Sequence, residues 1–399
     1  MPSSDERRVT RRDLLRASSV VGMASLAGCA EQALVSAPSP APDTWPLANY
    51  GPRNTARSPD VSPPSTPTVE RFSSTGAATS VVVGGTGETR RILVGGYDGV
   101  TAHHQDGTIA WRDDEGPTVA IRPNSRFCYV GGDELQARNL RDGTVQWSVD
   151  LPSRSYAIMP SSRGPFVPYN GGINAYDKDG NERYRISRGA GVGYAGVAID
   201  DAVYVTDVGM TERLAPRGLL QQLQDKPPAA RWRAEQGINF GQIPILGTDG
   251  VYVIDESMDD QKGGVVALDT EGSVRWHRSL GDYPLGAALG PQQLFVTMLD
   301  TGTSGDGERL YALDRADGTT NWTLSEFGRE DGYYGDTVIA GGSLVVGGAT
   351  PDRDGFIAAY SFEGERRWMR EFESPTRDIA PVKHRIYAAT EDGSLYVLS

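Results

Sequence analysis

An aromatic residue recurs at the same place in a short sequence pattern along this chain of 399 residues. Each recurrence follows a turn, usually Asp-Gly or Glu-Gly, by a few residues, and successive recurrences are 36 to 48 residues apart. A period of this length is typical of stacked supersecondary units such as propeller blades, and it argues against one continuous sheet. The series consists of Trp111, Trp147, Tyr184, Trp232, Trp276, Trp322 and Trp368.

Each period contains the sequence of four short strands. The segment that ends in the aromatic residue reads as strand, turn and strand, as in 137–147 (ARNLRDGTVQW). Gly reaches positive φ without a Cβ clash, so Asp-Gly between two apolar runs is a strong hairpin signal. Another short apolar strand precedes each hairpin, for example 127–132 (FCYVGG). Together with the segment before it, each period predicts one four-stranded antiparallel blade.

The last blade is divided between the two ends of the chain. Residues 376–398 supply three strands, and the sequence reaches Ser399 without a fourth. Residues 67–73 (PTVERFS) read as a strand that lacks the strands expected before it. Pairing this N-terminal strand with the C-terminal sheet would close the ring and remove two exposed edges. The sequence therefore predicts an all-β, eight-bladed propeller whose last blade is closed by an N-terminal strand.

The spacing within the repeat resembles a known family. Segments 137–147 and 312–322 (ALDRADGTTNW) match the tryptophan-docking motif of the eight-bladed propellers with pyrroloquinoline-quinone (PQQ) repeats. The lead-in that starts at Trp45 (WPLANYGPRNTARSP) is similar to the segment before the first strand in that superfamily, so the resemblance covers residues 45–399. It implies a structural docking role between blades for the seven aromatic residues. Truncating a fully buried one to Ala would cost ~3–5 kcal/mol.

The first residues read as an export signal. Arg11 and Arg12 lie in a segment that resembles a twin-arginine signal, and the apolar stretch 17–27 that follows is too short to span a bilayer. It leads into Leu26–Cys29 (LAGC), which resembles a lipobox. Cys29 would then carry a lipid and hold the protein at the outer face of the cytoplasmic membrane. The alternative is a plain signal peptide in which Cys29 is incidental.

These signals divide the chain into three parts. The segment after Cys29 is rich in Ala, Ser and Pro, and such a composition cannot bury a core. The predicted parts are a signal peptide at 1–28, a flexible tether at 29–43 and the propeller at 44–399.

The charge of the chain constrains its partners. The sequence has 52 acidic and 39 basic residues, only four of them Lys, and a net charge of −13. So acidic a surface repels nucleic acid and anionic headgroups, which argues against both as direct partners. Acid-rich, Lys-poor surfaces resemble those of haloarchaeal proteins, so we predict a haloarchaeal origin. We also expect a monomer.

The sequence predicts no catalytic, cofactor-binding or metal-binding residue. The dehydrogenases of the family that this chain resembles use a pair of adjacent cysteines, a calcium ion and an Asp base. This chain cannot form such a pair, because Cys128 is its one cysteine besides Cys29. His103 and His104 are neighbours on a strand, so they point to opposite faces and cannot chelate one ion. The Gly-rich segment 191–196 leads into a strand, not into the helix that a dinucleotide site needs.

Three weaker signals are left open. Acidic loops in the fifth to seventh blades could hold calcium, but they lack the alternating ligand series of a calcium loop. The insertion RGLLQQLQDKPPAA at 217–230 reads as a short amphipathic cap or as a lobe that docks a partner. Asn321 heads a glycosylation sequon, a motif short enough to occur by chance.

Two functions from different classes fit these observations. The first is a membrane-anchored, extracytoplasmic, non-enzymatic scaffold that binds unknown proteins at the cell surface, similar in architecture to BamB-type lipoproteins. The second is a PQQ-dependent oxidoreductase with a divergent active site. We favour the scaffold because the repeats are kept while the recognisable cofactor residues are missing, so we predict no cofactor.

Overall fold

The computed structural model describes residues 40–399 except 42, 48, 74–75, 119, 156, 188–195, 208, 216, 218–225, 236–239, 242–243, 257–262, 282, 300–308 and 326–332. Arg11, Arg12 and Cys29 lie outside these residues, and so does most of the insertion at 217–230. Within the described part, no helix has the length and apolar character needed to cross a membrane.

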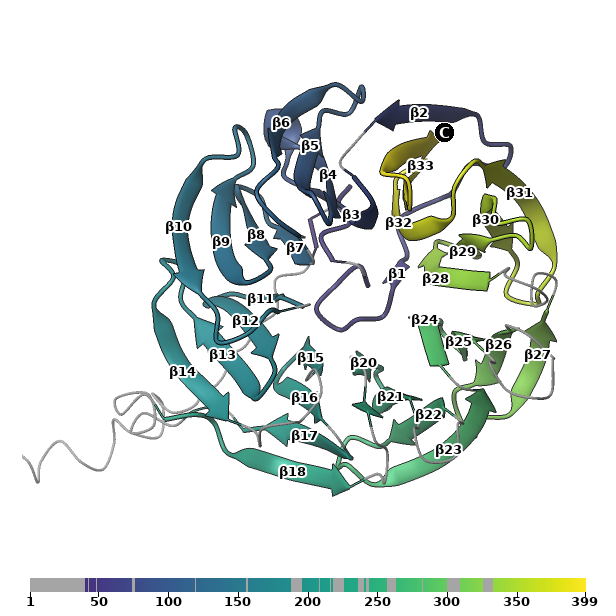
Figure 1. Cartoon of the computed structure of the whole chain (residues 1–399). Helices are drawn as coiled ribbons and strands as arrows, with labels where there is room; N and C mark the ends of the chain where they lie inside the picture. Colours follow the sequence, from purple (N-terminus) through teal and green to yellow (C-terminus); the bar gives the residue numbers. More distant parts are fainter. Residues whose placement is uncertain are drawn as a thin grey trace, which may run out of the picture.

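The chain forms a ring of eight antiparallel sheets, which confirms the predicted propeller (Figure 1). In each blade, the first strand faces the ring centre and the fourth lies at the rim. The first four blades comprise β3 (Ala78–Gly84), β4 (Arg91–Gly96), β5 (Gly99–His103) and β6 (Ile109–Asp113); β7 (Ala120–Pro123), β8 (Phe127–Gly131), β9 (Glu134–Asn139) and β10 (Val145–Asp150); β11 (Met159–Ser161), β12 (Gly164–Tyr169), β13 (Gly172–Tyr176) and β14 (Glu182–Ser187); β15 (Gly196–Ile199), β16 (Val203–Asp207), β17 (Met210–Leu214) and β18 (Ala230–Glu235).

The fifth blade has its inner strand in two pieces, and the eighth is completed from the N-terminal side of the chain. A short helical turn, η1 (Gly87–Thr89), links β3 and β4. The remaining blades comprise β19 (Phe240–Gly241) with β20 (Ile245–Leu246), β21 (Val251–Glu256), β22 (Gly263–Leu268) and β23 (Val274–Gly281); β24 (Tyr283–Leu289), β25 (Gln293–Leu299), β26 (Arg309–Asp314) and β27 (Thr320–Leu324); β28 (Tyr333–Ala340), β29 (Ser343–Ala349), β30 (Gly355–Tyr360) and β31 (Arg366–Phe372); β32 (Thr376–Val382), β33 (Arg385–Thr390), β34 (Ser394–Leu398) and β2 (Val69–Ser73).

The strand β2 closes the eighth blade, as predicted. It pairs antiparallel with β34 from Val69 opposite Leu398 to Ser73 opposite Ser394. Thr68 and Ser399 extend this ladder, since each backbone N–H donates to the other residue's carbonyl, at 2.9 and 3.1 Å. Two segments more than 300 residues apart in sequence therefore share one sheet and remove each other's free edge.

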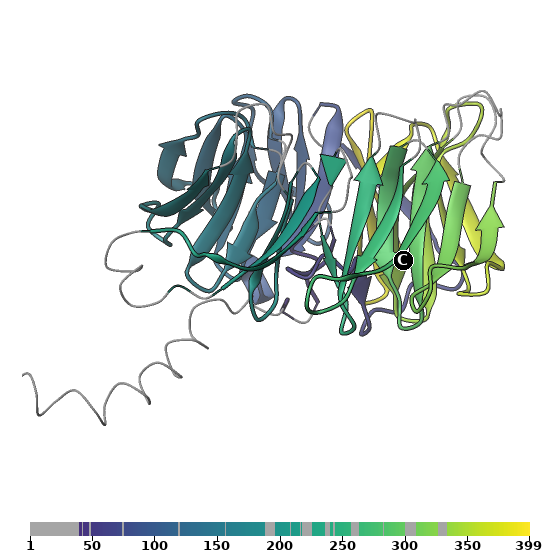
Figure 2. The same ribbon diagram turned by 90° about the horizontal axis from the view of Figure 1, so that it is seen from below.

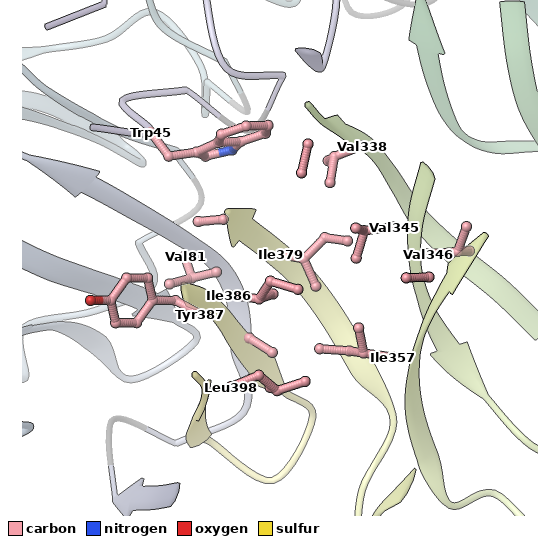
Figure 3. Close-up of a cluster of buried hydrophobic side chains, with 14 of the residues drawn as sticks. Trp45, Val81, Val338, Val345, Val346, Ile357, Ile379, Ile386, Tyr387 and Leu398 are labelled. Carbon is pink, nitrogen blue, oxygen red and sulfur yellow. The ribbon is translucent and has the colours of Figure 1, made fainter. Parts of the chain in front are cut away.

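Apolar side chains fill the spaces between neighbouring blades. The largest cluster joins the sixth, seventh, eighth and first blades, and its members include Val81, Val345, Ile357 and Ile386 (Figure 3). The second strand of the seventh blade, β29, is buried along its whole length, so it reads as the continuous apolar run SLVVGGA. Seen from the side, the sheets stand next to one another around the ring axis (Figure 2).

Most of the docking aromatic residues lie against a glycine in the turn of the next blade. A Cβ on Gly143, whose φ is +76°, would meet the Trp111 ring at 2.8 Å, so only glycine allows this approach. The Trp111 indole N–H also donates to the Leu140 carbonyl at 2.9 Å. The same two contacts recur for Trp147 with Gly180 and Lys178, Trp232 with Gly272 and Thr270, Trp276 with Gly318 and Arg315, and Trp322 with Gly364 and Phe362.

Tyr184 and Trp368 face different surroundings. The fourth blade has the insertion at 217–230 where the other blades have a tight turn, and the Arg217 guanidinium lies 4.4 Å from the centre of the Tyr184 ring. Trp368 faces the eighth blade, in which no covalent turn links β34 to β2, and it is 9% exposed within the large cluster. Tyr184 therefore contacts Arg217, and Trp368 packs within the large cluster, where the other rings contact a turn glycine.

The structure adds an eighth docking residue that the sequence analysis missed. Phe72 of β2 lies against Gly107, whose φ is +83°, and a Cβ there would overlap the phenyl ring. Phe72 stands opposite Leu395 of β34, as Trp111 stands opposite Ala102 in the first blade. The eighth blade therefore contacts the first through the same kind of ring-on-glycine packing.

Candidate functional site

The ring centre is the natural place for a site in a propeller, and here the chain itself occupies one end of it. Residues 44–62, which we call the strap, run along the inner strands from the first blade to the eighth (Figure 1). Trp45 and Val83 exchange two backbone hydrogen bonds of 2.8 Å, and Ser62 donates to the Lys383 carbonyl at 2.9 Å. Within the strap, β1 (Arg57–Ser58) pairs in parallel with β28.

The strap satisfies inner-strand N–H groups that would otherwise be unpaired. In five blades, one residue near the end of the first strand donates its N–H to a strap carbonyl. This residue comes just before the residue pair that closes the hairpin between the first and second strands. These bonds are Val83 to Trp45, Ile199 to Pro52, Leu246 to Arg53, Leu289 to Thr55 and Ile339 to Ala56, at 2.7 to 2.9 Å.

The other three blades have proline at the equivalent position. Pro123, Pro160 and Pro381 occupy it in the second, third and eighth blades. Proline has no N–H, so nothing is left unsatisfied where the strap makes no such bond. All eight inner strands thus meet the requirement that buried backbone donors be paired.

Asn54 fixes the strap at the ring centre. Its backbone has φ +55°, a conformation that Asn tolerates better than most residues. The side-chain amide donates to the carbonyls of Val197 and Pro244, both at 3.0 Å, and the residue is 3% exposed. One side chain therefore joins the strap to the fourth and fifth blades.

The strap divides the molecule into two unlike faces. On the strap face the inner strands end, and Trp45 and Ala56, each 0% exposed, fill the ring centre beside Val338 and Ile379 (Figure 3). On the far face the inner strands begin. The strap end is therefore closed by the chain itself.

A cavity of about 210 Å³ lies beside the strap on the strap face. It falls where the strap passes the second and third blades, between residues 40–52 and the hairpins of the first three blades. Its wall is mainly apolar, because five prolines line it: Pro40, Pro46, Pro52, Pro123 and Pro160.

Two carboxyl groups lie together among the inner strands. Asp336 of β28 and Asp378 of β32 accept the same backbone N–H. The Ile379 N–H donates to both, at 3.1 Å to Asp336 Oδ2 and 2.9 Å to Asp378 Oδ1. The Val81 N–H of the first blade donates to Asp378 Oδ2 at 2.8 Å. The pair therefore links three neighbouring blades.

The environment of the pair favours its protonated forms. Burial, and the charge of Asp336, raise the pKa of Asp378 well above its ordinary value. Burial also raises the pKa of Asp336 to about 6. Arg122 of β7 acts in the opposite direction on Asp378 through its positive charge, and burial lowers the pKa of Arg122 to about 10. Arg122 stays charged at neutral pH and donates to the Ile158 carbonyl at 2.9 Å.

The strap takes up one end of the ring centre. Asp336 and Asp378 accept hydrogen bonds from backbone amides. Cys128 is fully buried, and that burial raises the pKa of its thiol to about 12. Among the described residues, no group of three or more His, Cys, Asp or Glu side chains is placed to hold a metal ion.

Other residues singled out from the sequence are far from one another. His103 is buried beside the Gly107 carbonyl at 3.0 Å, whereas His104 is exposed. Asn321 lies exposed on the rim strand β27. The Gly-rich segment 191–196 falls outside the described residues except for Gly196, where β15 begins. Most of the acidic loops also fall outside them.

Sequence reasoning missed the strap contacts, Phe72 and the pair of carboxyl groups. One signal was available for the pair, since Asp336 and Asp378 both precede apolar inner-strand sequence (DTVIA and DIAPV). A charged residue at the same position of two neighbouring buried strands is unusual, and it needs a hydrogen-bonding partner.

The chain belongs to the family described as outer membrane protein assembly factor BamB, whose profile matches residues 97–399. It is therefore a BamB-like propeller of PQQ repeats. A comparison with curated protein sequences found no match. The comparisons lend no support to a haloarchaeal origin, which stays a prediction.

Solved structures of several functions share the fold. BamB from Moraxella catarrhalis matches with a TM-score of 0.63 and 18% identity over 83% of this chain and 98% of its own. Quinohemoprotein alcohol dehydrogenase ADHIIG from Pseudomonas putida HK5 matches with 0.65 and 12% over 93% and 80%. A europium-containing methanol dehydrogenase matches with 0.63 and 13% over 90% and 89%. At these identities the likeness concerns the fold alone.

Proposed function

We propose that this protein is a membrane-anchored, extracytoplasmic scaffold that binds other proteins through its far face. The observation that carries this proposal is the strap, which closes one end of the ring centre with the chain's own residues. With that end closed, the rim and the far face are the surfaces we expect a partner to reach. The BamB family assignment supports a role in binding other proteins and not in turning over a small molecule.

The position of the strap also suggests how the molecule is oriented. Pro40 lies on the strap face, 11 positions after Cys29 in the sequence. A chain of that length spans at most about 40 Å when extended. If Cys29 carries a lipid, the strap face lies toward the membrane and the far face points away from it. The localisation and the lipid anchor rest on the sequence signals at Arg11, Arg12 and Cys29.

The first experiment tests the anchor. Replacing Cys29 by Ser should move the protein from the membrane fraction to the soluble extracytoplasmic fraction, because the lipid would have no attachment point. Replacing Cys128, which is buried in β8, should leave the protein with the membrane. Retention of Cys29→Ser at the membrane would refute lipid anchoring through this residue.

The second experiment tests the binding face. A photo-crosslinking residue at Tyr97, 62% exposed in a turn on the far face, should give a discrete adduct with another protein in intact cells. The same residue at Ile109, 49% exposed near the strap face, is the matched control. An adduct only at Ile109, or none at either position, would count against binding through the far face.

A further inference from the structure

The closing region of the ring contains a pair of carboxyl groups, one buried and one partly buried, that the proposed scaffold role does not use. Asp336 and Asp378 lie at equivalent positions in the seventh and eighth blades, and each accepts an N–H from the next blade around the ring. Asp378 is 5% exposed. The pair therefore ties together the three blades at which the ring is also closed by β2.

The geometry of the pair favours one shared proton. Two carboxyl oxygens, Asp336 Oδ2 and Asp378 Oδ1, accept the single Ile379 N–H at 3.1 and 2.9 Å, so the two groups lie close together. A carboxylate has no hydrogen to donate, so the two groups can bond to each other only if one of them is protonated. Two full negative charges at this separation would repel strongly in a buried site.

We propose that Asp336 and Asp378 share one proton at neutral pH and form a pH-sensitive latch that holds the seventh, eighth and first blades together. In this arrangement Asp378 carries the proton and donates it to the Asp336 carboxylate. Loss of the proton at higher pH replaces the hydrogen bond by repulsion across the interface between the seventh and eighth blades. The latch therefore loosens as the pH rises.

The charged groups around the pair set how firmly the proton is held. Arg122 of β7 is the described side chain whose positive charge acts on Asp378, and it opposes proton retention. Arg377 of β32 is 45% exposed in its side chain and forms an ion pair with Glu391 at 3.0 Å. The other titratable residues on the strands packed against β28 and β32 are Arg57, Tyr283, Arg309, Tyr311, Asp314, Tyr360, Arg385 and Tyr387.

The sign of the pH effect follows from the direction of the pKa shifts. Both groups have a higher pKa in the folded protein than in the unfolded chain, so the folded state retains protons that the unfolded state has released. Stability from this source is fully present below the unfolded pKa, and it is lost as the pH rises through the folded values. For each proton that only the folded state retains, the unfolding equilibrium constant rises about tenfold per pH unit.

The test compares chemical unfolding of full-length variants between pH 7 and 8. In the wild type we expect the unfolding constant to rise over this unit, by up to about tenfold for one retained proton. In Asp378→Asn we expect little change, because the amide donates to Asp336 permanently and still accepts from the Val81 N–H. An equal slope in both proteins would overturn the proposal.

Asp249→Asn is the matched control. Asp249 is also partly buried, but its pKa is lowered, with hydrogen bonds from Tyr252, Arg315 and Arg275 opposing the effect of burial. It is ionised in both states above pH 7, so this variant should unfold more easily yet keep the wild-type slope. A flattened slope in the control would show that the slope does not report on the pair, and would also overturn the proposal.

A spectroscopic measurement covers the case in which Asp378→Asn fails to fold. Infrared spectra of the wild type at pH 7 should contain the carbonyl band of a buried protonated carboxylic acid. Asp336→Asn, which leaves Asp378 without its charged partner, should shift or remove this band. Absence of the band from the wild type would refute the shared proton, whatever the partners of the far face prove to be.

Discussion

The contact between Phe72 and Gly107 predicts how firmly the ring is closed, and it can be tested by a single methyl group. In Gly107→Ala the new Cβ would overlap the Phe72 ring. Left-handed backbone costs a residue with a Cβ about 1–2 kcal/mol, and φ at Gly107 is +83°. Forcing a methyl group into a packed interface adds about 1–3 kcal/mol. We therefore expect Gly107→Ala to lose about 2–5 kcal/mol of stability.

Gly116 provides a control with the same backbone and no neighbour. Its φ is +77°, and a Cβ there would meet nothing within 4 Å. Gly116→Ala should therefore cost only the backbone term, about 1–2 kcal/mol. The difference between the two alanine variants isolates the contact with Phe72.

The assay is chemical denaturation, with amide hydrogen exchange of β2 as the local readout. Gly107→Ala should lower the denaturation midpoint more than Gly116→Ala and speed exchange in β2, because the strand is pushed away from its seat. In a Phe72→Ala background, Gly107→Ala should cost no more than Gly116→Ala, since the overlap is gone. Equal costs for the two glycine variants in the wild-type background would refute the seating of Phe72 on Gly107.

Three further predictions concern other contacts of the ring. Trp276→Ala should cost about 3–5 kcal/mol in denaturation, whereas Trp276→Phe, which keeps a ring but loses the bond to the Arg315 carbonyl, should cost about 1–2 kcal/mol. Asn54→Ala loses two buried hydrogen bonds and adds strain at positive φ, so in denaturation it should be less stable than Asn54→Gly, which loses the bonds alone; the reverse order would contradict the strain, and wild-type stability of Asn54→Gly would contradict the anchoring role. Arg217→Met should cost about 0.5–2 kcal/mol of stability by removing the cation from the Tyr184 ring, and it should leave Trp276 fluorescence unchanged.

The repeat made the ring predictable because its signals are local. Most blades have their turn glycine and their aromatic residue within a few positions of each other, as in Gly143 and Trp147, so a reader of the sequence sees both. The divided blade was predictable for a related reason, since counting strands showed that PTVERFS and the C-terminal hairpin each lacked what the other had. In these places hydrophobic pattern and turn chemistry agree with the fold.

The missed features depend on residues far apart in the sequence. The turn glycine that seats Phe72 belongs to the next blade, and β34, its partner strand, lies at the other end of the chain, so no repeat flags this residue. The strap is held by backbone hydrogen bonds to five separate blades. Such bonds do not require particular side chains, so the strap shows no apolar periodicity in its sequence. Pro123, Pro160 and Pro381 would have looked like strand interruptions. Only the ring geometry reveals that they occupy the position at which the other blades donate to the strap.

The strap and β2 together determine when the ring can form. Both come from the first part of the propeller, yet their partners extend to Lys383 and Leu398 near its end. Contacts of such sequence separation pay a large loop-closure cost before they stabilise anything, and they form late. The strap carbonyls that accept from the later blades, and the edge of β2, therefore stay unpaired until most of the chain has been made. If the protein is exported by the twin-arginine route, which carries folded proteins, the ring would close before it crosses the membrane, and these edges would never be exposed outside the cell.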